Sequence, residues 1–202
     1  MQRLILIILL GLGPILNAQS NMNGFYCDPE TGLCVIPEVE DTAAPAEVWK
    51  EDEEIIYVGD PMCSWCWGFA PVKTRIEDLC RERAVLTLVL GGLHADWTEP
   101  ADTERKAFLR DHWKEVGERT GQPFIYDILD VEGLTYGTEA SCRAAVTVRQ
   151  MAGNDAALTF FTGLQRAYYA ESRDVTSAEG LADIAAEFGH DRAEFAAPPA
   201  PP

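Results

Sequence analysis

The stretch Cys63-Ser64-Trp65-Cys66 places two cysteines two residues apart, between an apolar run and an amphipathic stretch. The apolar run, Ile55-Ile56-Tyr57-Val58, has the length and composition of a buried strand, and Gly59-Asp60-Pro61 ends it. The stretch that follows predicts a helix over residues 63–83. The first cysteine therefore lies at a helix N-terminus, where the positive end of the helix dipole favours thiolate over thiol. Since thiolate is the reactive form, this context predicts thiol–disulfide exchange.

Exchange needs an attacking thiolate and a second thiol close enough to resolve a mixed disulfide. The sulfur of Cys63 would lie near free backbone N–H groups of the first turn, and Cys66 lies one turn deeper. We therefore expect Cys63 to be the nucleophile and Cys66 the resolving thiol, with no organic cofactor. Ser64, Trp65 and Pro61 are the neighbours expected to tune the thiolate. None of them carries positive charge, so the direction of the reaction stays open.

Length and charge limit the class of protein. A chain of 202 residues that is 47% hydrophobic is large enough for one globular domain with a sizeable core and additional tails. Its formal net charge of −17 argues against nucleic acid and anionic membranes as partners, because both are polyanions.

Residues 1–18 have the features of an export signal. Arg3 supplies a positive end, Leu4 to Leu10 form an unbroken apolar run, and Ala18 is a small residue suited to cleavage. The apolar stretch is shorter than the roughly 18–20 residues of a spanning helix, so we expect cleavage and no membrane insertion afterwards. The mature protein is then expected to be periplasmic or secreted. Its partners would be exported cysteine-containing proteins, together with a redox partner that resets the cysteine pair.

Residues 19–54 form a flexible N-terminal segment in this interpretation, with one local structure. Cys27 and Cys34 flank Asp-Pro-Glu-Thr-Gly, which is turn chemistry between two short apolar arms, so the two cysteines are expected to face each other across a hairpin. Disulfides persist in an oxidising compartment, and a structural disulfide is therefore the preferred interpretation. A resolving or regulatory pair and two free thiols remain alternatives.

The remaining chain alternates as expected for an α/β protein. A second apolar strand, Val85 to Leu90, follows the helix, and its continuous apolar character predicts strands covered on both faces. The strand–helix–strand order predicts parallel pairing. Residues 101–189 are expected to be helical, with a last helix that begins at the capping box Thr176-Ser177-Ala178-Glu179. The Pro/Ala tail, 196–202, is expected to be disordered.

The cysteine stretch and its surroundings carry a family resemblance. Pro71 follows the second cysteine by five residues, as in the thioredoxin superfamily, and the wider string from Asp60 to Pro71 resembles its DsbA-like branch. Within that branch the chain resembles a group of predicted protein-disulfide isomerases related to the FrnE-type proteins. Supporting strings, which extend the likeness over about 54–195, are Gly91-Gly92-Leu93, Thr120-Gly121-Gln122-Pro123-Phe124, Thr138-Glu139-Ala140-Ser141-Cys142 and Leu164-Gln165-Arg166-Ala167-Tyr168-Tyr169.

The resemblance implies an α/β thioredoxin-like fold with a helical insertion between the second and third strands. It also implies a cis-proline loop, two more strands and a final helix, but after Phe195 this sequence continues into the Pro/Ala tail. We therefore expect an incomplete DsbA-like domain over 55–195, with the cis-proline loop and the C-terminal strands absent. Its sheet would contain two strands of this unit and would expose an unpaired edge.

Two alternative functions remain. Met62 next to the cysteine pair is compatible with soft-metal binding, since Cu(I) prefers sulfur ligands, although the spacing differs from the usual copper-carrier motif. The three histidines are far apart in sequence and show no ligand spacing, so no metal site is assigned. The second alternative is an inactive, truncated fragment.

Several residues outside the motif are expected to have ordinary structural roles. Cys80 and Cys142 lie on apolar helix faces and are interpreted as buried small hydrophobes. His94 follows the second strand and is interpreted as a loop histidine. Trp67 is expected in the core, whereas Trp65 is expected to be exposed and to offer an apolar surface to unfolded substrates.

Overall fold

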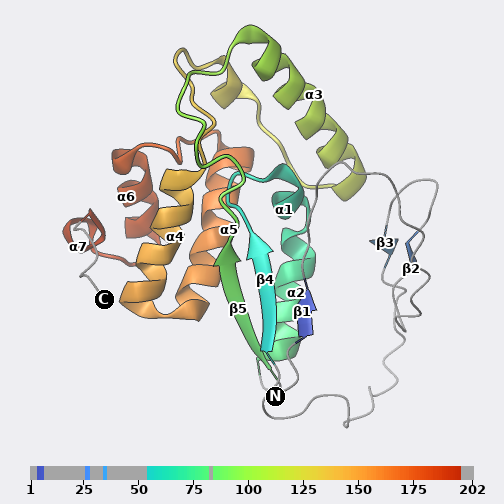
Figure 1. The fold of residues 1–202 in the computed structure, drawn as a ribbon, viewed down its shortest axis with the longest axis vertical. Coiled ribbons are helices and arrows are strands. Elements are labelled where there is room, and N and C mark those ends of the chain that lie inside the picture. The colour runs from blue at the N-terminus through green and yellow to red at the C-terminus, as the bar shows by residue number, and fades with distance from the viewer. Residues whose placement is uncertain (1–3, 7–25, 28–33, 36–53, 82–83, 197–202) are drawn as a thin grey trace.

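The computed structural model describes residues 4–6, 26–27, 34–35, 54–81 and 84–196, the first three ranges through their backbone pairing. A parallel sheet has the strand order β1 (Leu4–Leu6), β4 (Glu54–Gly59) and β5 (Val85–Leu90). Two further strands, β2 (Tyr26–Cys27) and β3 (Cys34–Val35), pair antiparallel. The helices, shown in Figure 1, are α1 (Ser64–Gly68), α2 (Ala70–Cys80), α3 (Thr103–Thr120), the 3-10 helix η1 (Asp127–Asp130), α4 (Glu139–Ala152), α5 (Asn154–Glu171), α6 (Ala178–Glu187) and α7 (Arg192–Ala196).

The two central strands confirm the predicted α/β unit. β4 and β5 pair in parallel over their full length, with Ile55 opposite Leu86 and Tyr57 opposite Leu88. The helices α1 and α2 connect them, and the segment from α3 to α7 follows β5 as a helical insertion. The strand–helix–strand unit followed by a run of helices is the order that the resemblance implied for the described residues.

The N-terminal predictions fall mostly outside the described residues. In the antiparallel pair of β2 and β3, the backbone of Cys27 lies opposite that of Cys34. The disulfide between them stays a prediction. The export signal, the flexible segment and the Pro/Ala tail also lie outside the described residues, apart from the three short strands and Ala196.

The single predicted helix over 63–83 is two helices in the structure. The chain leaves α1 at Phe69, and α2 begins with Ala70 and Pro71. Proline has no backbone N–H and its ring crowds the carbonyl four residues earlier, so Pro71 is tolerated in the first turn of a helix and not in its interior. The break at Phe69 is the structural consequence of Pro71.

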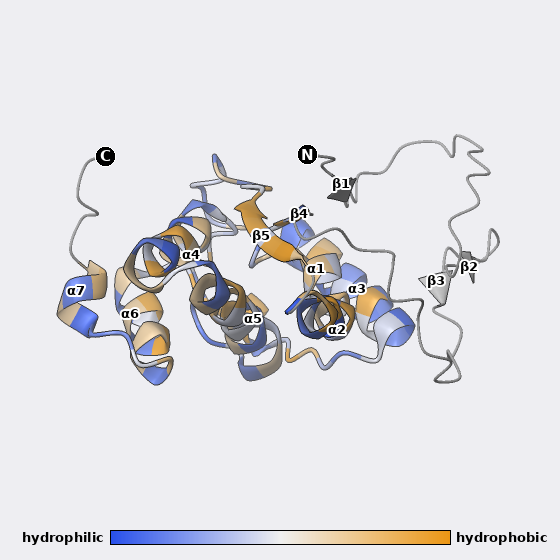
Figure 2. Cartoon of the chain, turned by 90° about the horizontal axis from the view of Figure 1, so that it is seen from below, coloured by the Kyte–Doolittle hydropathy of each residue, from blue (hydrophilic) through white to orange (hydrophobic). Residues whose placement is uncertain are grey.

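The prediction that both faces of the sheet are covered is wrong for β5. Leu86 and Leu88 are buried against the helices, but Val85 is 61% exposed and Val89 is 40% exposed on the opposite face. Figure 2 shows α2 and α5 on one side of β4 and β5, and no described helix on the other side. A continuous apolar run therefore did not mean burial on both faces here.

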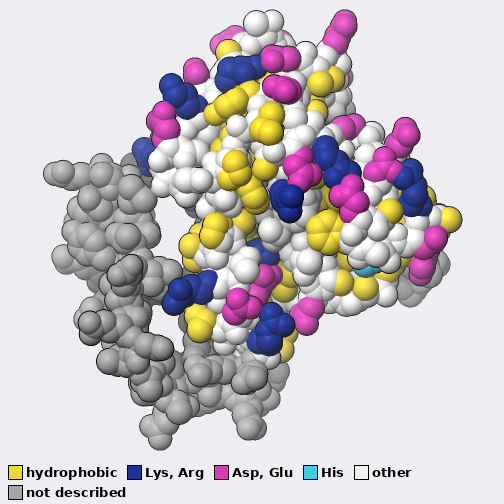
Figure 3. All heavy atoms as spheres, turned by 180° about the vertical axis from the view of Figure 1, so that it is seen from behind, with side chains coloured by type: hydrophobic (Ala, Val, Ile, Leu, Met, Phe, Trp, Pro, Cys, Tyr) yellow, Lys and Arg dark blue, Asp and Glu magenta, His cyan; other side chains and the backbone are white. Residues whose placement is uncertain are grey.

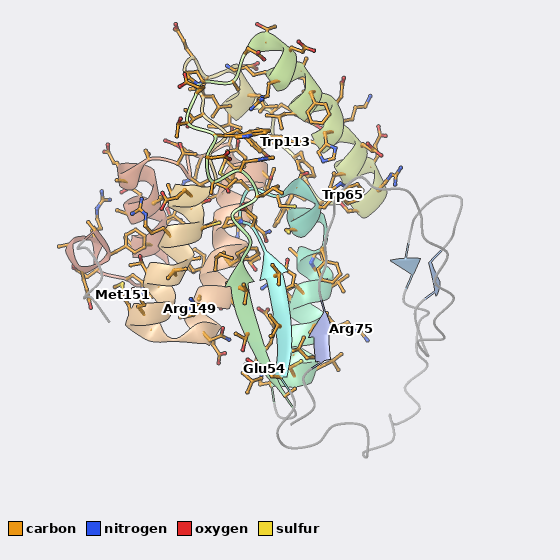
Figure 4. All side chains as sticks on the ribbon, viewed as in Figure 1. Glu54, Trp65, Arg75, Trp113, Arg149 and Met151 are labelled. Carbon is orange, nitrogen blue, oxygen red and sulfur yellow. The ribbon has the colours of Figure 1, made fainter. Side chains whose placement is uncertain are left out.

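The outer edge of β5 is bonded rather than exposed as an unpaired edge. Asn154, the first residue of α5, accepts a hydrogen bond from Leu88 N–H (3.1 Å) and donates one to the Leu86 carbonyl (2.5 Å). Arg149 of α4, labelled in Figure 4, donates to the Leu88 carbonyl at 2.9 Å. Side chains of the insertion thus provide the partners that a neighbouring strand would otherwise supply.

The larger core lies among the helices of the insertion. Trp113 of α3 is fully buried and contacts the rings of Tyr168 and Tyr169 from α5 (Figure 4). Helix α3 ends at Gly121, a left-handed residue with φ 72°. The last long helix begins one residue later than the predicted capping box, because Ser177 and not Thr176 is its N-cap and accepts from Gly180 N–H.

Other features of the described residues bear on the expected class of protein. From Gly91 to Ala196 the described chain contains no strand longer than the isolated Pro100–Thr135 bridge, and no described peptide bond is cis.

None of the described helices combines the length and apolar character needed to cross a bilayer. On the face shown in Figure 3, basic side chains lie among acidic ones, so the negative net charge does not appear there as a uniform acidic surface.

Candidate redox site

A tight turn carries the chain from β4 to the cysteine pair. β4 ends at Gly59, and the N–H of Cys63 donates to the Asp60 carbonyl (3.1 Å). Cys63 is extended, with φ −87° and ψ 114°, and serves as the N-cap of α1; its carbonyl accepts from Trp67 N–H (3.1 Å). Glycine and the Asp-Pro turn thus end the strand, and the first cysteine lies where free N–H groups begin a helix.

The two cysteines differ in access to solvent. Cys63 is half-buried, whereas Cys66 is 8% exposed and packs in the smaller core between the sheet and the helices. Both are free thiols in the structure. Access therefore favours Cys63 as the sulfur that meets another molecule.

Hydrogen bonding between the sulfurs also separates the two thiols. The pKa of Cys63 is lowered, chiefly because the Cys66 thiol donates a hydrogen bond to its thiolate, while burial opposes the effect and the N–H groups of Cys66 and Trp65 assist it. The pKa of Cys66 is raised, because its proton is held in that hydrogen bond and because the sulfur is buried. This environment thus favours the thiolate form of Cys63 and the protonated form of Cys66.

Asp60 is a buried carboxylate beside the pair and was not among the site residues predicted from the sequence. Its Oδ1 accepts from Met62 N–H (2.8 Å), and its Oδ2 accepts from Leu93 N–H (2.8 Å) and from the Cys142 thiol (3.3 Å). It connects the turn before Cys63 with the loop after β5 and with α4. An Asp-Pro turn that leads into a buried motif was the available signal, because Asp commonly bonds the N–H two residues later.

Two tyrosines of the insertion bind the carbonyl that precedes Cys63. The hydroxyls of Tyr136 and Tyr169 donate to the Met62 carbonyl at 2.8 and 2.6 Å, and the two hydroxyl oxygens are 3.4 Å apart. Tyr136 belongs to the loop before α4 and Tyr169 to α5. Met62 and Tyr169 are completely buried and Tyr136 is 4% exposed. No sequence pattern signals this contact, because its partners are far apart in the chain.

Tyr57 lies beneath Cys66. Its ring stacks on Phe69 and meets Phe161 edge-on, with centroids 6.2 and 5.9 Å apart. Among the described residues its buried hydroxyl has no partner that meets hydrogen-bond geometry. Burial is the main reason that the pKa of Tyr57 is raised, and the nearby Cys66 adds to the effect. Tyr57 therefore stays neutral beside the buried thiol.

The predicted burial is confirmed for Trp67, but the predicted exposure of Trp65 is wrong. Trp67 is 6% exposed, and its indole N–H donates to the Pro123 carbonyl (3.0 Å). Trp65 is half-buried rather than exposed, because His112 of α3 meets its ring edge-on and the Arg119 guanidinium lies over it. Figure 4 shows Trp65 on α1 beside α3.

The other residues considered in the sequence differ in how near they lie to the cysteine pair. Ser64 and Pro61 are buried in the turn and first helix. Cys80 is buried at the far end of α2, as predicted, and Cys142 is buried but contacts the site through Asp60. His94 stacks on Trp97 with ring centroids 3.6 Å apart, and burial lowers its pKa. Within the described residues, no three His, Cys, Asp or Glu side chains form a group that could hold a metal ion.

Comparison with known proteins finds solved structures that are similar to this chain. No protein-family model matches the chain. A crystal structure of a candidate protein disulfide isomerase from Nitrosomonas europaea is 35% identical, with a TM-score of 0.63, covering 69% of this chain and 66% of that one. The cytosolic disulfide reductase DsbM from Pseudomonas aeruginosa is 22% identical, with a TM-score of 0.61, covering 71% and 68% of the two chains.

A curated relative extends the comparison. The ClpXP adapter protein SpxH of Halalkalibacterium halodurans is 22% identical over 177 residues, which are 86% of this chain and 56% of that protein. The chain thus spans a little over half the length of that relative. The two solved structures agree with this chain in overall fold, as their TM-scores show. The chain is a DsbA-like member of the thioredoxin superfamily.

Proposed function

We propose that this protein is a thiol–disulfide oxidoreductase that works through Cys63 and Cys66. The observation that carries the proposal is the asymmetry of the pair: Cys63 is half-buried and its pKa is lowered, whereas Cys66 is buried and its pKa is raised. The disulfide isomerase and reductase neighbours are consistent with this chemistry.

In the reducing direction, the Cys63 thiolate attacks one sulfur of a substrate disulfide. The substrate S–S bond breaks, a Cys63–substrate disulfide forms, and the departing sulfur leaves as a thiolate. Cys66 then loses its proton, which can pass to that thiolate, and attacks the Cys63 sulfur. The substrate leaves reduced by two electrons and the protein retains a Cys63–Cys66 disulfide. An external dithiol must reduce that disulfide; the oxidising direction is the reverse sequence.

We further propose that the substrates are cysteines of exported proteins and that the protein works in the periplasm or outside the cell. The support is the sequence of residues 1–18, in which a positive residue precedes a short apolar run and a small residue. Expression of the full chain followed by fractionation and N-terminal sequencing tests this. A mature N-terminus near residue 19 is expected, and an intact chain in the cytosol would contradict the proposal.

Insulin reduction and oxidative refolding of a reduced disulfide protein test the activity. The wild-type protein is expected to accelerate at least one of the two reactions, and Cys63→Ser is expected to abolish the acceleration. Cys66→Ser should accumulate a covalent complex with the substrate. Cys80→Ser is the matched control, because Cys80 is buried away from the turn and should leave the rate unchanged. An inactive wild-type protein, or equal rates for Cys63→Ser and wild type, would refute the proposed activity.

A further inference from the structure

The Met62 carbonyl, in the turn before Cys63, accepts one more hydrogen bond than a buried carbonyl needs. Two buried hydroxyls from different segments, Tyr136 and Tyr169, donate to one carbonyl, that of Met62. A single donor would satisfy a buried carbonyl. The second donor therefore fixes the direction of the carbonyl as well as satisfying it.

That direction sets the orientation of the next peptide group. The carbonyl of Met62 and the N–H of Cys63 belong to one planar unit, so they point in opposite directions. The carbonyl is held by the two tyrosines on one side, and the N–H is held by the Asp60 carbonyl at 3.1 Å on the other. The peptide that carries Cys63 is thus fixed at both ends, and the side chain can vary only by its own rotation.

We propose that Tyr136 and Tyr169 are positioning residues for the nucleophile: by holding the Met62 carbonyl they keep the sulfur of Cys63 beside the Cys66 thiol and the first N–H groups of α1. Neither tyrosine touches the reacting atoms. Because both belong to the helical insertion, the insertion acts on the redox pair through this carbonyl. The inference deepens the proposed function and rests on it for the reaction rate alone.

The neighbouring Tyr168 supplies a matched control. Tyr168 and Tyr169 are consecutive residues of α5, and both are completely buried. Among the described residues the Tyr168 hydroxyl has no hydrogen-bond partner, whereas the Tyr169 hydroxyl donates to Met62 at 2.6 Å. Replacing either by phenylalanine removes one oxygen from a buried ring and keeps the packing. The two variants differ in the bond to the carbonyl.

The experiment titrates the Cys63 thiolate in the reduced full-length protein by its ultraviolet absorbance, with Cys63→Ser as the blank. Tyr136→Phe/Tyr169→Phe is expected to raise the midpoint by about half a pH unit, which is about a threefold fall in the ratio of thiolate to thiol at a given pH and is the order expected for losing one net hydrogen bond. The single variants should fall by less than the double variant. Tyr168→Phe should titrate as wild type. Insulin reduction should slow in the same order.

Two results would overturn the proposal. One is a double variant that folds but titrates as wild type, since the hydroxyls would then serve stability alone. The other result concerns the single variants and decides the matter if the double variant does not fold. Tyr169→Phe and Tyr168→Phe are expected to differ in the titration of Cys63, and the proposal is overturned if they titrate alike. Failure of the proposed function is distinguishable, because the wild type would then lack exchange activity whatever its thiolate titration shows.

Discussion

Asp60→Asn is the substitution whose effects the structure specifies most fully. The asparagine has the same shape and can keep its oxygen on Met62 N–H, as the aspartate does at 2.8 Å. Its amide nitrogen then replaces Oδ2, which accepts from Leu93 N–H at 2.8 Å and from the Cys142 thiol at 3.3 Å. A donor would face the N–H of Leu93, so that bond is lost.

The magnitude follows from the lost contact. Asp60 is 3% exposed, so water cannot replace the missing acceptor readily. A hydrogen bond to a charged group contributes about 1.5–3 kcal/mol, and we expect the free energy of unfolding to fall by about 2 kcal/mol. For a domain of this size that corresponds to a fall in melting temperature on the order of 4–8 °C.

The same substitution should act on the thiolate in the opposite sense. The negative charge of Asp60 raises the pKa of Cys63, so its removal should lower that pKa further. Asp60→Asn is thus expected to be less stable, yet to hold more thiolate at a given pH. Asp130→Asn, at an exposed ion pair with Arg110, is the control and should change stability by less than about 1 kcal/mol.

Denaturant unfolding and thiolate titration of the reduced proteins measure both effects. The reasoning is refuted if Asp60→Asn is as stable as Asp130→Asn. It is also refuted if the pKa of Cys63 rises in Asp60→Asn.

Three further predictions concern packing, a buried cation and pH. A methyl group at Gly68 would meet the Thr120 Cγ2 at 2.8 Å, and Thr120 cannot turn away easily because its hydroxyl donates to the Val116 carbonyl (2.7 Å). Gly68→Ala should therefore lower the unfolding free energy by about 1–3 kcal/mol, and an unchanged denaturation midpoint would contradict this. Lys73 is 1% exposed and bonds Glu77 at 2.6 Å. Lys73→Met keeps most of the buried volume but leaves Glu77 without its cation, whereas Lys73→Ala also leaves a cavity, so Lys73→Ala should be the more destabilising of the two; equal midpoints would be inconsistent with this packing. The pKa of Cys63 is lowered on folding, so its thiolate contributes stability that is fully present above the ordinary thiol pKa of roughly 8.5 and is lost as pH falls through the folded value. Between the lowered pKa of Cys63 in the folded protein and the ordinary thiol pKa, the unfolding free energy of the reduced protein should therefore rise with pH more steeply in wild type than in Cys63→Ser, and parallel curves would exclude this contribution.

Local patterns predicted the elements around the cysteine pair because those elements depend on neighbours in sequence. The apolar run before Gly59 and the run from Val85 are the two central strands, and Gly121 ends α3 as its left-handed cap. Pro71 was part of the family signature, but its local effect, a break at Phe69, requires steric reasoning that periodicity does not contain.

The contacts that surround the pair were not predictable in the same way. Asp60, Tyr136 and Tyr169 meet the turn through the folding of segments far apart in the chain. Burial was also misjudged where tertiary packing decides it: Val85 is apolar but exposed, and Trp65 is covered by α3. The sequence therefore indicated the candidate cysteine pair, and the structure was needed to find the residues that contact the turn before it.

Site-resolved alkylation tests the central claim most directly. The fully reduced protein is treated briefly with a small alkylating reagent over a range of pH, and each cysteine is quantified by peptide mapping. Cys63 is expected to react first, with a midpoint below the ordinary thiol value, and Cys66 is expected to stay unmodified at neutral pH. Reaction of Cys66 before Cys63, or a midpoint for Cys63 at or above the ordinary thiol value, would contradict it.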